Sequence, residues 1–188
     1  MNDNVPDRRQ LELTDGRITL RPYRKSDIAP TFRAIKESAA EMSPWLPFVH
    51  PEYSMKETGA WVKKRPAEWK AGRSYEFAIL DAKDGTMLGG CGLNGVNRIS
   101  RRANLGYWVR TGRTGQGIAP AATRLLAKWG FEALKLLRIE IVVATGNARS
   151  LRAAEKAGST REGVLRNEII IRDKPHDAVM HSLIPGEV

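Results

Sequence analysis

The stretch VRTGRTGQGIAPAATRLL, Val109 to Leu126, joins a glycine-rich loop to an apolar segment. Gly112, Gly115 and Gly117 predict tight turns, and Pro120 is typical of the first turn of a helix, where a backbone N–H has no partner within the helix. Apolar residues then follow at the spacing of one helical face: Ala122, Leu125, Leu126, Trp129, Ala133 and Leu136. The stretch therefore predicts a loop followed by a helix that packs on a sheet.

The residues around these glycines do not match either of two known phosphate-binding motifs. Gly112 and Gly117 have the separation of a P-loop, but Ile118 and Ala119 replace the lysine and the hydroxyl residue that contact phosphate and metal. The dinucleotide-binding loop needs a third glycine for close packing of its helix, and Pro120 occupies that place. Neither motif explains the loop.

A loop that leads directly into a helix can hold an anion without either motif. The first backbone N–H groups of a helix have no intrahelical acceptor, and the helix dipole favours negative charge there. Residues Gly115–Ala119 are thus predicted to form a cradle for a pyrophosphate, and Pro120 marks where the usable N–H groups end. On the glycines alone, a purely structural turn is an equally good interpretation.

Length and composition predict one folded domain. The 188 residues are 41% hydrophobic and 28% charged, which is too apolar for a disordered chain. We expect a disordered tail at residues 1–10 and a single domain over residues 11–188. No apolar run approaches the roughly 20 residues needed to span a bilayer, and the first residues lack the apolar segment of a secretory signal.

The charge and the cysteine content indicate the compartment and the class of ligand. Cys91 is the single cysteine and cannot form an internal disulfide, which agrees with a reducing cytoplasm and favours a place in the core over a role as nucleophile. The 31 basic and 21 acidic residues give a formal net charge of +10, which attracts nucleic acid, an acidic protein or a phosphorylated cofactor. Arginines crowd residues 97–113, beside the glycine loop.

Two helices are predicted in the first part of the chain. Ser26 or Asp27 can cap a helix that continues to about residue 35. Ser54 and Glu57 form a capping box at the start of the second helix, which Pro66 can bend or end. With the helix after the glycine loop and a short one capped by Asn147, the chain has about four helices.

Strand patterns fall between and after these helices. They cover residues 17–22, 75–80, 86–96, 103–110, 139–144, 162–171 and 177–184. The second and third form a hairpin, and Gly106 in the fourth indicates a bulge or a close approach by a ligand. The order predicts an α/β domain with a mixed, mostly antiparallel sheet of seven strands.

Several motifs, taken in order, resemble one family. After GYWV (Gly106–Val109) and the glycine loop come NARSLRAAEKAG (Asn147–Gly158), EGVLRN and HDAVMHSLI. This run is similar to the GNAT superfamily of acetyl-CoA-dependent N-acetyltransferases, and within it to the RimJ/RimL type that acetylates protein N-termini. The cofactor signature Q/RxxGxG/A falls on Thr114–Ala119, with Thr114 departing at its first place. The resemblance extends from about Arg17 to the end of the chain.

The resemblance implies where the cofactor binds, with no metal involved. It implies a sheet splayed between its fourth and fifth strands, a bulge at Gly106–Val109, and the pantetheine arm of acetyl-CoA in the gap. The residues implied to bind the cofactor are Tyr107, Trp108 and Val109 along the arm, Arg113, Thr114, Gly115, Gln116, Gly117, Ile118 and Ala119 at the pyrophosphate, and Asn147 and Ser150 beside the thioester.

Acetyl transfer to an amine needs a neutral nucleophile and a proton for the departing thiolate. Because a protein α-amine has a pKa near 8, a weak base suffices at neutral pH (about a tenth is already unprotonated). Ser150 is the predicted acid, although a serine in a first helical turn is often only structural, and Ala154 stands where many relatives carry a tyrosine. Glu168 is the predicted base, with a solvated strand carboxylate as the alternative; Glu76 is a weaker second candidate.

Two aromatic residues and a His–Asp pair complete the candidate site residues. Trp45 and Phe48 can shape the mouth through which the acceptor enters, although an aromatic loop is often only a cover for the core. His176 and Asp177 resemble a catalytic dyad, but the resemblance to the family favours a structural role for them in the turn and the sheet.

The sequence thus predicts a cytoplasmic, acetyl-CoA-dependent N-acetyltransferase without a membrane partner. Its expected acceptor is a protein N-terminal α-amine, such as that of a ribosomal protein. Three alternatives stay open: an acetyltransferase for a small amine (a polyamine, an aminoglycoside or an amino acid analogue), a basic module that binds nucleic acid, and a protein that binds the cofactor without turnover. The basic surface also allows contact with ribosomal RNA, and both a monomer and a homodimer are compatible with the sequence.

Overall fold

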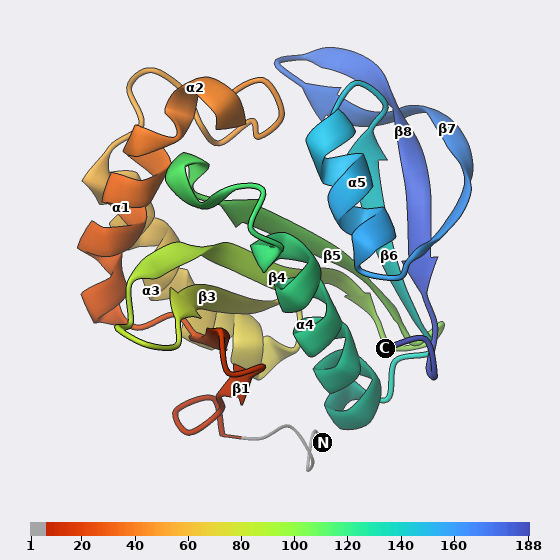
Figure 1. Ribbon diagram of the computed structural model, residues 1–188, viewed down its shortest axis with the longest axis horizontal. Coiled ribbons are helices and arrows are strands. Elements are labelled where there is room, and N and C mark those ends of the chain that lie inside the picture. Colours follow the sequence, from red (N-terminus) through yellow and green to blue (C-terminus); the bar gives the residue numbers. More distant parts are fainter. Residues whose placement is uncertain (1–6) are drawn as a thin grey trace.

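A computed structural model describes residues 7–188 as one mixed sheet flanked by helices (Figure 1). The strands are β1 (Leu13–Thr14), β2 (Ile18–Pro22), β3 (Tyr75–Asp81), β4 (Met87–Asn97), β5 (Arg102–Val109), β6 (Arg138–Ala144), β7 (Thr160–Ile171) and β8 (Lys174–Leu183). The helices are α1 (Ile28–Glu37), α2 (Ala39–Met42), α3 (Met55–Ala71), α4 (Ile118–Leu134) and α5 (Ala148–Lys156), with 3-10 turns η1 (Lys25–Asp27) and η2 (Thr111–Arg113). The strand order is β1-β2-β3-β4-β5-β6-β8-β7.

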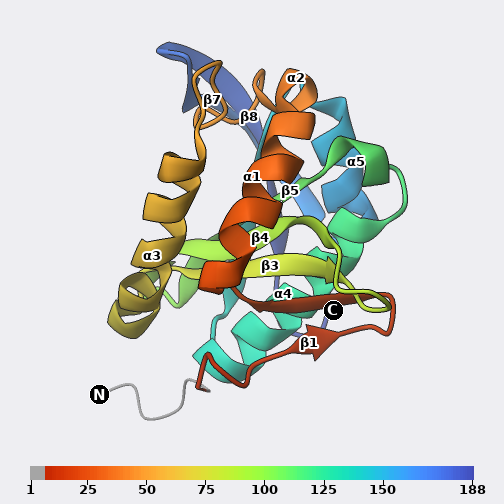
Figure 2. The same cartoon turned by 90° about the vertical axis from the view of Figure 1, so that its left-hand side faces the viewer.

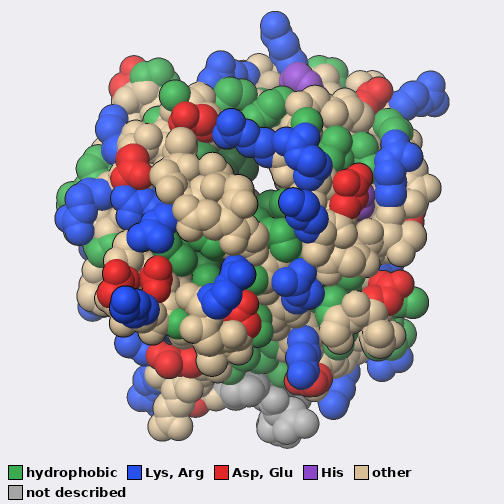
Figure 3. Space-filling view, in the orientation of Figure 1, with side chains coloured by type: hydrophobic (Ala, Val, Ile, Leu, Met, Phe, Trp, Pro, Cys, Tyr) green, Lys and Arg blue, Asp and Glu red, His purple; other side chains and the backbone are tan. Residues whose placement is uncertain are grey.

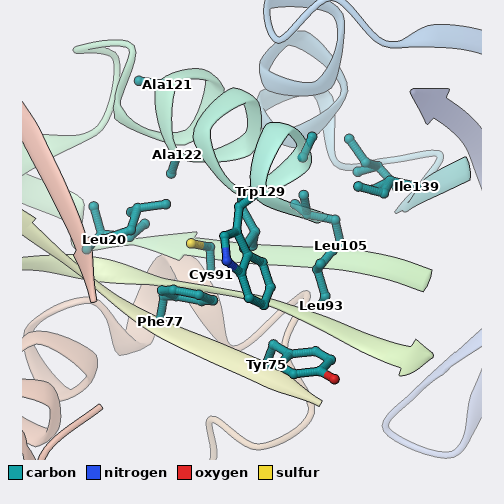
Figure 4. Packing of buried hydrophobic residues seen from close by; sticks show 14 of the residues in the cluster. Leu20, Tyr75, Phe77, Cys91, Leu93, Leu105, Ala121, Ala122, Trp129 and Ile139 are labelled. Carbon is teal, nitrogen blue, oxygen red and sulfur yellow. The ribbon is translucent and has the colours of Figure 1, made fainter. Parts of the chain in front are cut away.

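The two faces of the sheet carry different helices because side chains alternate along each strand. Tyr75 and Phe77 of β3 pack with Trp129 of α4, their ring centroids 5.3 Å from the indole in both cases (Figure 4). Ala78 and Leu80 point to the opposite face, into a cluster with residues of α1 and α3. Figures 1 and 2 show α4 and α5 on one face and α1 and α3 on the other.

The sheet opens in its middle. All neighbouring strands are antiparallel except β5 and β6, which pair in parallel over only three residues each, from Arg102↔Arg138 to Asn104↔Glu140. Beyond Asn104, the backbones of β5 and β6 separate, so each leaves a row of main-chain groups along the gap. The splay predicted between these two strands is confirmed.

The local signals for the helices are confirmed where they are strongest. Ser54 and Glu57 form the predicted capping box, with the Glu57 N–H 3.4 Å from Ser54 Oγ. Asn147 Oδ1 accepts the N–H of Ser150 at 3.1 Å, and Gly158 follows α5 with a φ of +93°. Pro66 lies inside α3 without ending it.

The structure differs from the sequence-based expectation in three places. The two-residue β1 and the four-residue α2 were not predicted, because elements this short leave no periodic pattern. The prediction of a bulge at Gly106–Val109 was wrong. The register of β5 with β4 is unbroken from Gly89↔Val109 to Asn94↔Asn104, and it shifts only farther along β4, between Asn94 and Asn97. Gly106 instead leaves space on its face of the sheet.

The tail predicted at residues 1–10 includes a turn that contacts the domain. Within the predicted tail, residues 1–6 lie outside the described residues, and Asp7–Gln10 form a turn from which the Arg8 guanidinium donates to the Tyr23 carbonyl at 2.8 Å. Across residues 7–188, no helix combines the length and apolar character needed to cross a bilayer.

Candidate functional site

A cleft of about 910 Å³ occupies the gap between β5 and β6. Its walls include Tyr107 and Val109, which pack in the cluster on the face of α4, and Trp108, which packs in the cluster on the face of α1 and α3. Gly106, on the same side of the strand as Trp108, also lines it. Because residues of both orientations line it, the cleft gives access to both faces of the sheet. Figure 3 shows the hollow in the face that carries α4 and α5, with Lys and Arg side chains around it.

The glycine loop borders this cleft and leads into α4. Gly115 and Gly117 have φ values of +77° and +75°, a conformation that costs other residues roughly 1–2 kcal/mol. The first hydrogen bond of the helix joins the Ala121 N–H to the Gly117 carbonyl at 3.1 Å. Within residues 7–188, the backbone N–H groups of Gly115–Ala119 have no acceptor, and Gly117 caps α4 without a side chain.

A ring of basic side chains surrounds the same opening. Arg113 comes from η2, and Arg149, Arg152 and Lys156 come from α5. The last three were missed from the sequence, although their spacing of three and four residues places them on one face of a helix. Free N–H groups, a helix dipole and these cations together suit an anion with two or more charges.

Ser150 and Tyr107 meet across the gap between β5 and α5. The Tyr107 hydroxyl lies 2.9 Å from the Ser150 carbonyl oxygen and 3.0 Å from Ser150 Oγ. A carbonyl only accepts, so both contacts are satisfied when Tyr107 donates to it and the Ser150 hydroxyl donates to the Tyr107 oxygen. Burial raises the pKa of Tyr107, which therefore keeps its proton at neutral pH. This link between Tyr107 and Ser150 was not predicted.

The predicted cofactor residues line the cleft with one exception. Gln116 is exposed, and its carbonyl accepts from Arg17 at 3.3 Å. The rest of the set lies in the wall: Tyr107, Trp108, Val109, Arg113, Thr114, Gly115, Gly117, Ile118, Ala119, Asn147 and Ser150.

Of the two aromatic residues predicted on the acceptor side, only one lines the cleft. Trp45 lines the cleft, and its indole lies close to Gly146 in the loop before α5, where an added Cβ would meet the ring at 3.3 Å. Phe48 is 45% exposed and lies outside the lining.

The two candidate bases lie in different settings. Glu168 is exposed on a bulge of β7 that spans Leu165 to Ile169; Ile169 lines the cleft, whereas Glu168 does not. Glu76 lies in the middle of β3, where burial raises the pKa of its carboxyl from 4.5 to about 7. The structure therefore does not bring Glu168 beside Ser150, and its role stays a prediction.

The His176–Asp177 pair shapes the sheet, as the family pattern favours. Asp177 Oδ1 accepts the N–H of Asn167 at 2.9 Å, inside the β7 bulge, and the Asp177 carbonyl accepts the N–H of Thr145 at 3.1 Å. His176 pairs with Ile169 in the β7–β8 ladder. Asp177 thus supports both the bulge and the end of β6 at the cleft.

Several arginines of the crowded segment at residues 97–113 are paired with acids. Arg102 lies 3.2 Å from Glu140, Arg110 Nε lies 3.2 Å from Glu37, and Arg113 lies 3.9 Å from Asp81. These contacts reduce the charge that the segment offers to a nucleic acid. Among the described residues, no group of three or more His, Cys, Asp and Glu side chains is placed to hold a metal ion.

This geometry, a splayed mixed sheet with a glycine loop and free N–H groups at the opening, agrees with a family model. Residues 17–160 match the model described as "Acetyltransferase (GNAT) domain". The chain belongs to the GNAT acetyltransferase family.

Individual relatives cover parts of the chain or its whole fold. The "Putative ribosomal N-acetyltransferase YdaF" of Bacillus subtilis is 36% identical over 104 residues, which are 55% of this GNAT chain and 57% of the relative. The spermidine N(1)-acetyltransferase of Escherichia coli K12 is 28% identical over 51% of this chain and 52% of its own length. The chain thus spans a little over half the length of these curated relatives.

A solved structure covers nearly the whole fold. RimJ of Mycobacterium smegmatis, in complex with CoA-disulfide, has a TM-score of 0.84 and 27% identity, with 94% of this chain and 87% of that one covered.

Proposed function

We propose that this GNAT domain is an acetyl-CoA-dependent N-acetyltransferase whose acceptor is a protein N-terminal α-amine. The observation that carries the proposal is the set of five backbone N–H groups, Gly115–Ala119, left without an acceptor beside the splay of the sheet. An unpaired row of donors at a helix start costs stability unless an anion or water accepts from it. A pyrophosphate satisfies the whole row.

The residues present fit acetyl-CoA. Gly115–Ala119 hold its pyrophosphate, Arg113 and the three cations of α5 neutralise its phosphates, and Tyr107–Val109 line its pantetheine arm. The CoA complex of the M. smegmatis RimJ, at 27% identity over nearly the whole chain, supports this assignment. When bound, acetyl-CoA supplies the acetyl group as a thioester, which an amine attacks without a metal.

Ser150 is the proposed acid for the departing thiolate. Its N–H is held by Asn147 and its hydroxyl by Tyr107, so the side chain is oriented before the substrates bind. The hydroxyl passes its proton to the sulfur and regains one from the nitrogen of the acceptor. Glu168 stays in the proposal as a base that acts through water, since it lies outside the wall of the cleft.

The charge of the lining favours a single amine over a polycation. The cleft is lined by one carboxylate, Glu41, which accepts from Thr111 at 3.1 Å, and by four cations from η2 and α5. A polyamine needs several carboxylates to pair with its charges, and Glu41 is the one acid among the described lining residues, whereas an N-terminal amine brings one charge. The ribosomal name of the B. subtilis relative points the same way, although the spermidine relative keeps a small amine as the alternative.

Contact with ribosomal RNA and a cytoplasmic location belong to the proposal as well. Both follow from a ribosomal-protein acceptor and from the net charge of +10. Binding of an rRNA fragment that weakens steeply as salt rises would support the contact, and binding that is independent of salt would contradict it.

The first experiment melts the protein with and without acetyl-CoA, then follows thiol release. At a concentration of about 100 times Kd, the cofactor is expected to stabilise the fold by about 2.7 kcal/mol. Thiol release is compared for N-terminal peptides, polyamines and aminoglycosides, with peptides expected to be fastest. No melting shift at millimolar acetyl-CoA would refute the proposal.

A variant pair tests the role of Ser150. Ser150→Ala is expected to lower kcat about 10²-fold or more while the melting shift with acetyl-CoA is kept, because the hydroxyl acts on the leaving group. Ser100→Ala is the control, since Ser100 lies exposed in the turn between β4 and β5. Equal turnover in both variants would remove the assignment.

A further inference from the structure

Glu76 carries a half-buried carboxyl that the proposed cofactor site does not use. It lies in β3 on the face covered by α1 and α3, and it pairs across the sheet with Gly92 of β4. It forms no hydrogen bond or ion pair with any residue in the range 7–188. A carboxyl that is largely shielded from water and accepts no hydrogen bond is costly to the fold when it is charged, and such groups concentrate at functional sites.

The carboxyl group points along the sheet, toward the cleft. A Cβ built on Gly92 would lie 2.0 Å from Glu76 Oε2 and 2.4 Å from its Cδ, so the carboxyl fills the space above this glycine. Gly92 pairs with Gly106 of β5, and directly paired Cα atoms lie about 5 Å apart. Glu76 thus reaches over one strand to the edge of the next.

The space above Gly106 is open. A Cβ built there would meet only Asn94 Nδ2, at 3.9 Å, and Gly106 itself lines the cleft. Any larger residue at position 92 would displace the carboxyl, and a larger one at position 106 would separate it from the cleft. Because neither glycine carries a side chain, the space between the Glu76 carboxyl and Gly106 at the cleft wall is unobstructed at these two positions, and we call this space the passage. Glu76 and Gly92 themselves lie outside the lining of the cleft.

We propose that Glu76, in place of Glu168, binds the amine of the acceptor and takes its proton. This inference rests on the proposed function and adds to it the residue that receives the acceptor. The ammonium gives one proton to the carboxylate, and the neutral nitrogen attacks the thioester carbon. The C–N bond forms, the C–S bond breaks, and the remaining extra proton on nitrogen passes through Ser150 to the sulfur. The protonated Glu76 then loses its proton to water.

The surroundings of Glu76 suit this role. Burial raises the pKa of the carboxyl to about 7, close to that of an α-amine, so proton transfer between them is nearly balanced. Arg65 of α3 lowers the pKa of Glu76, an effect smaller than that of burial, and the charge of Glu76 in turn helps to raise the pKa of the fully buried Tyr23 hydroxyl and of the Cys91 thiol. The Tyr23 hydroxyl has no hydrogen-bond partner within the described chain.

The test compares Glu76→Gln with Glu132→Gln, an exposed control on α4. Glu76→Gln is expected to lower kcat/KM for an N-terminal peptide about 100-fold, as expected for loss of a general base. In the wild type, kcat/KM is expected to rise with pH through an apparent pKa near 7, and this rise is expected to disappear in the variant. The melting shift with acetyl-CoA is expected to be unchanged. If Glu76→Gln keeps the kcat/KM of the wild type and an unchanged pH profile, the inference is overturned.

Two further measurements separate this inference from the proposed function. Gly106→Val narrows the passage without touching Glu76 and is expected to raise KM for the peptide; an unchanged KM would contradict the passage. Alaninamide, the smallest α-amine probe, is titrated into the CoA-bound protein. A saturable melting shift that disappears in Glu76→Gln supports the inference, and its absence in the wild type overturns it. Failure of acetyl-CoA itself to bind would instead refute the proposed function.

Discussion

Replacing Glu76 by glutamine is expected to make the protein more stable at neutral and higher pH. The folded chain raises the pKa of this carboxyl from 4.5 to about 7 because burial penalises the charged form. Folding therefore takes up a proton between these pH values, and the free energy of unfolding falls as pH rises through this window. Glutamine keeps the shape of the protonated acid and has no charge to bury.

The size of the effect follows from the pKa. One pKa unit corresponds to about 1.4 kcal/mol, so a rise from 4.5 to about 7 costs the wild type up to about 3 kcal/mol above pH 7. For a domain of this length, 1 kcal/mol shifts Tm by roughly 2–4 °C, which makes the expected gain of the variant roughly 6–12 °C at pH 8. At pH 4.5 the two proteins are expected to have nearly equal stability.

The assay is urea denaturation of the wild type, Glu76→Gln and the control Glu132→Gln at pH 5, 6, 7 and 8. The difference in unfolding free energy between Glu76→Gln and the wild type is expected to grow across the series. Other titrating groups, such as the buried His181 whose pKa is lowered, cancel in this difference. A difference that stays constant with pH would show that Glu76 is not desolvated, and the argument from its burial would fail.

Three other predictions concern the cleft and the sheet. Gly117→Ala is expected to cost about 1–2 kcal/mol of stability, measured by urea denaturation, and to weaken acetyl-CoA binding measured by calorimetry, because φ is +75° at the cradle. Gly163→Ala, at a glycine with open space and no positive φ, serves as its control and is expected to bind acetyl-CoA normally. Tyr107→Phe is expected to lower kcat with little change in KM for acetyl-CoA, because Ser150 loses its orienting partner; unchanged steady-state kinetics would contradict this role. Glu162→Gln is expected to flatten the loss of stability as pH falls from 4.5 toward 2, because Arg138 and Ser182 hold the pKa of Glu162 at about 2; a parallel acid denaturation curve would refute it.

The glycine loop and the helix caps could be predicted because their causes are local. Gly117 needs a positive φ, Pro120 fits a first helical turn, and Asn147 caps the helix through an N–H three residues ahead. Each signal depends on residues within one turn of chain. The short β1 and α2 lacked such a signal and depend on pairing and packing with distant segments.

The site was predicted in part, and the division has a physical reason. The proposed cradle, Gly115–Ala119, is contiguous in sequence, so a sequence motif is enough to locate it. The Tyr107–Ser150 contact joins residues 43 positions apart, and no local pattern reports it. Trp45 and Phe48 were indistinguishable as aromatic loop residues, and only the fold placed Trp45 in the wall and left Phe48 exposed.

The sequence by itself determined the order of the longer helices and strands and the glycine loop at the start of α4, because these depend on spacing along the chain, and its ordered motifs carried the resemblance to the family. The tertiary structure decided which side chains meet across the splay. It placed Glu168 outside the cleft, although Ile169 beside it lines the wall, and it aimed Glu76 over Gly92 toward Gly106. The alternation of a strand allows two faces, and only the packing of helices against the sheet decides which face becomes a site.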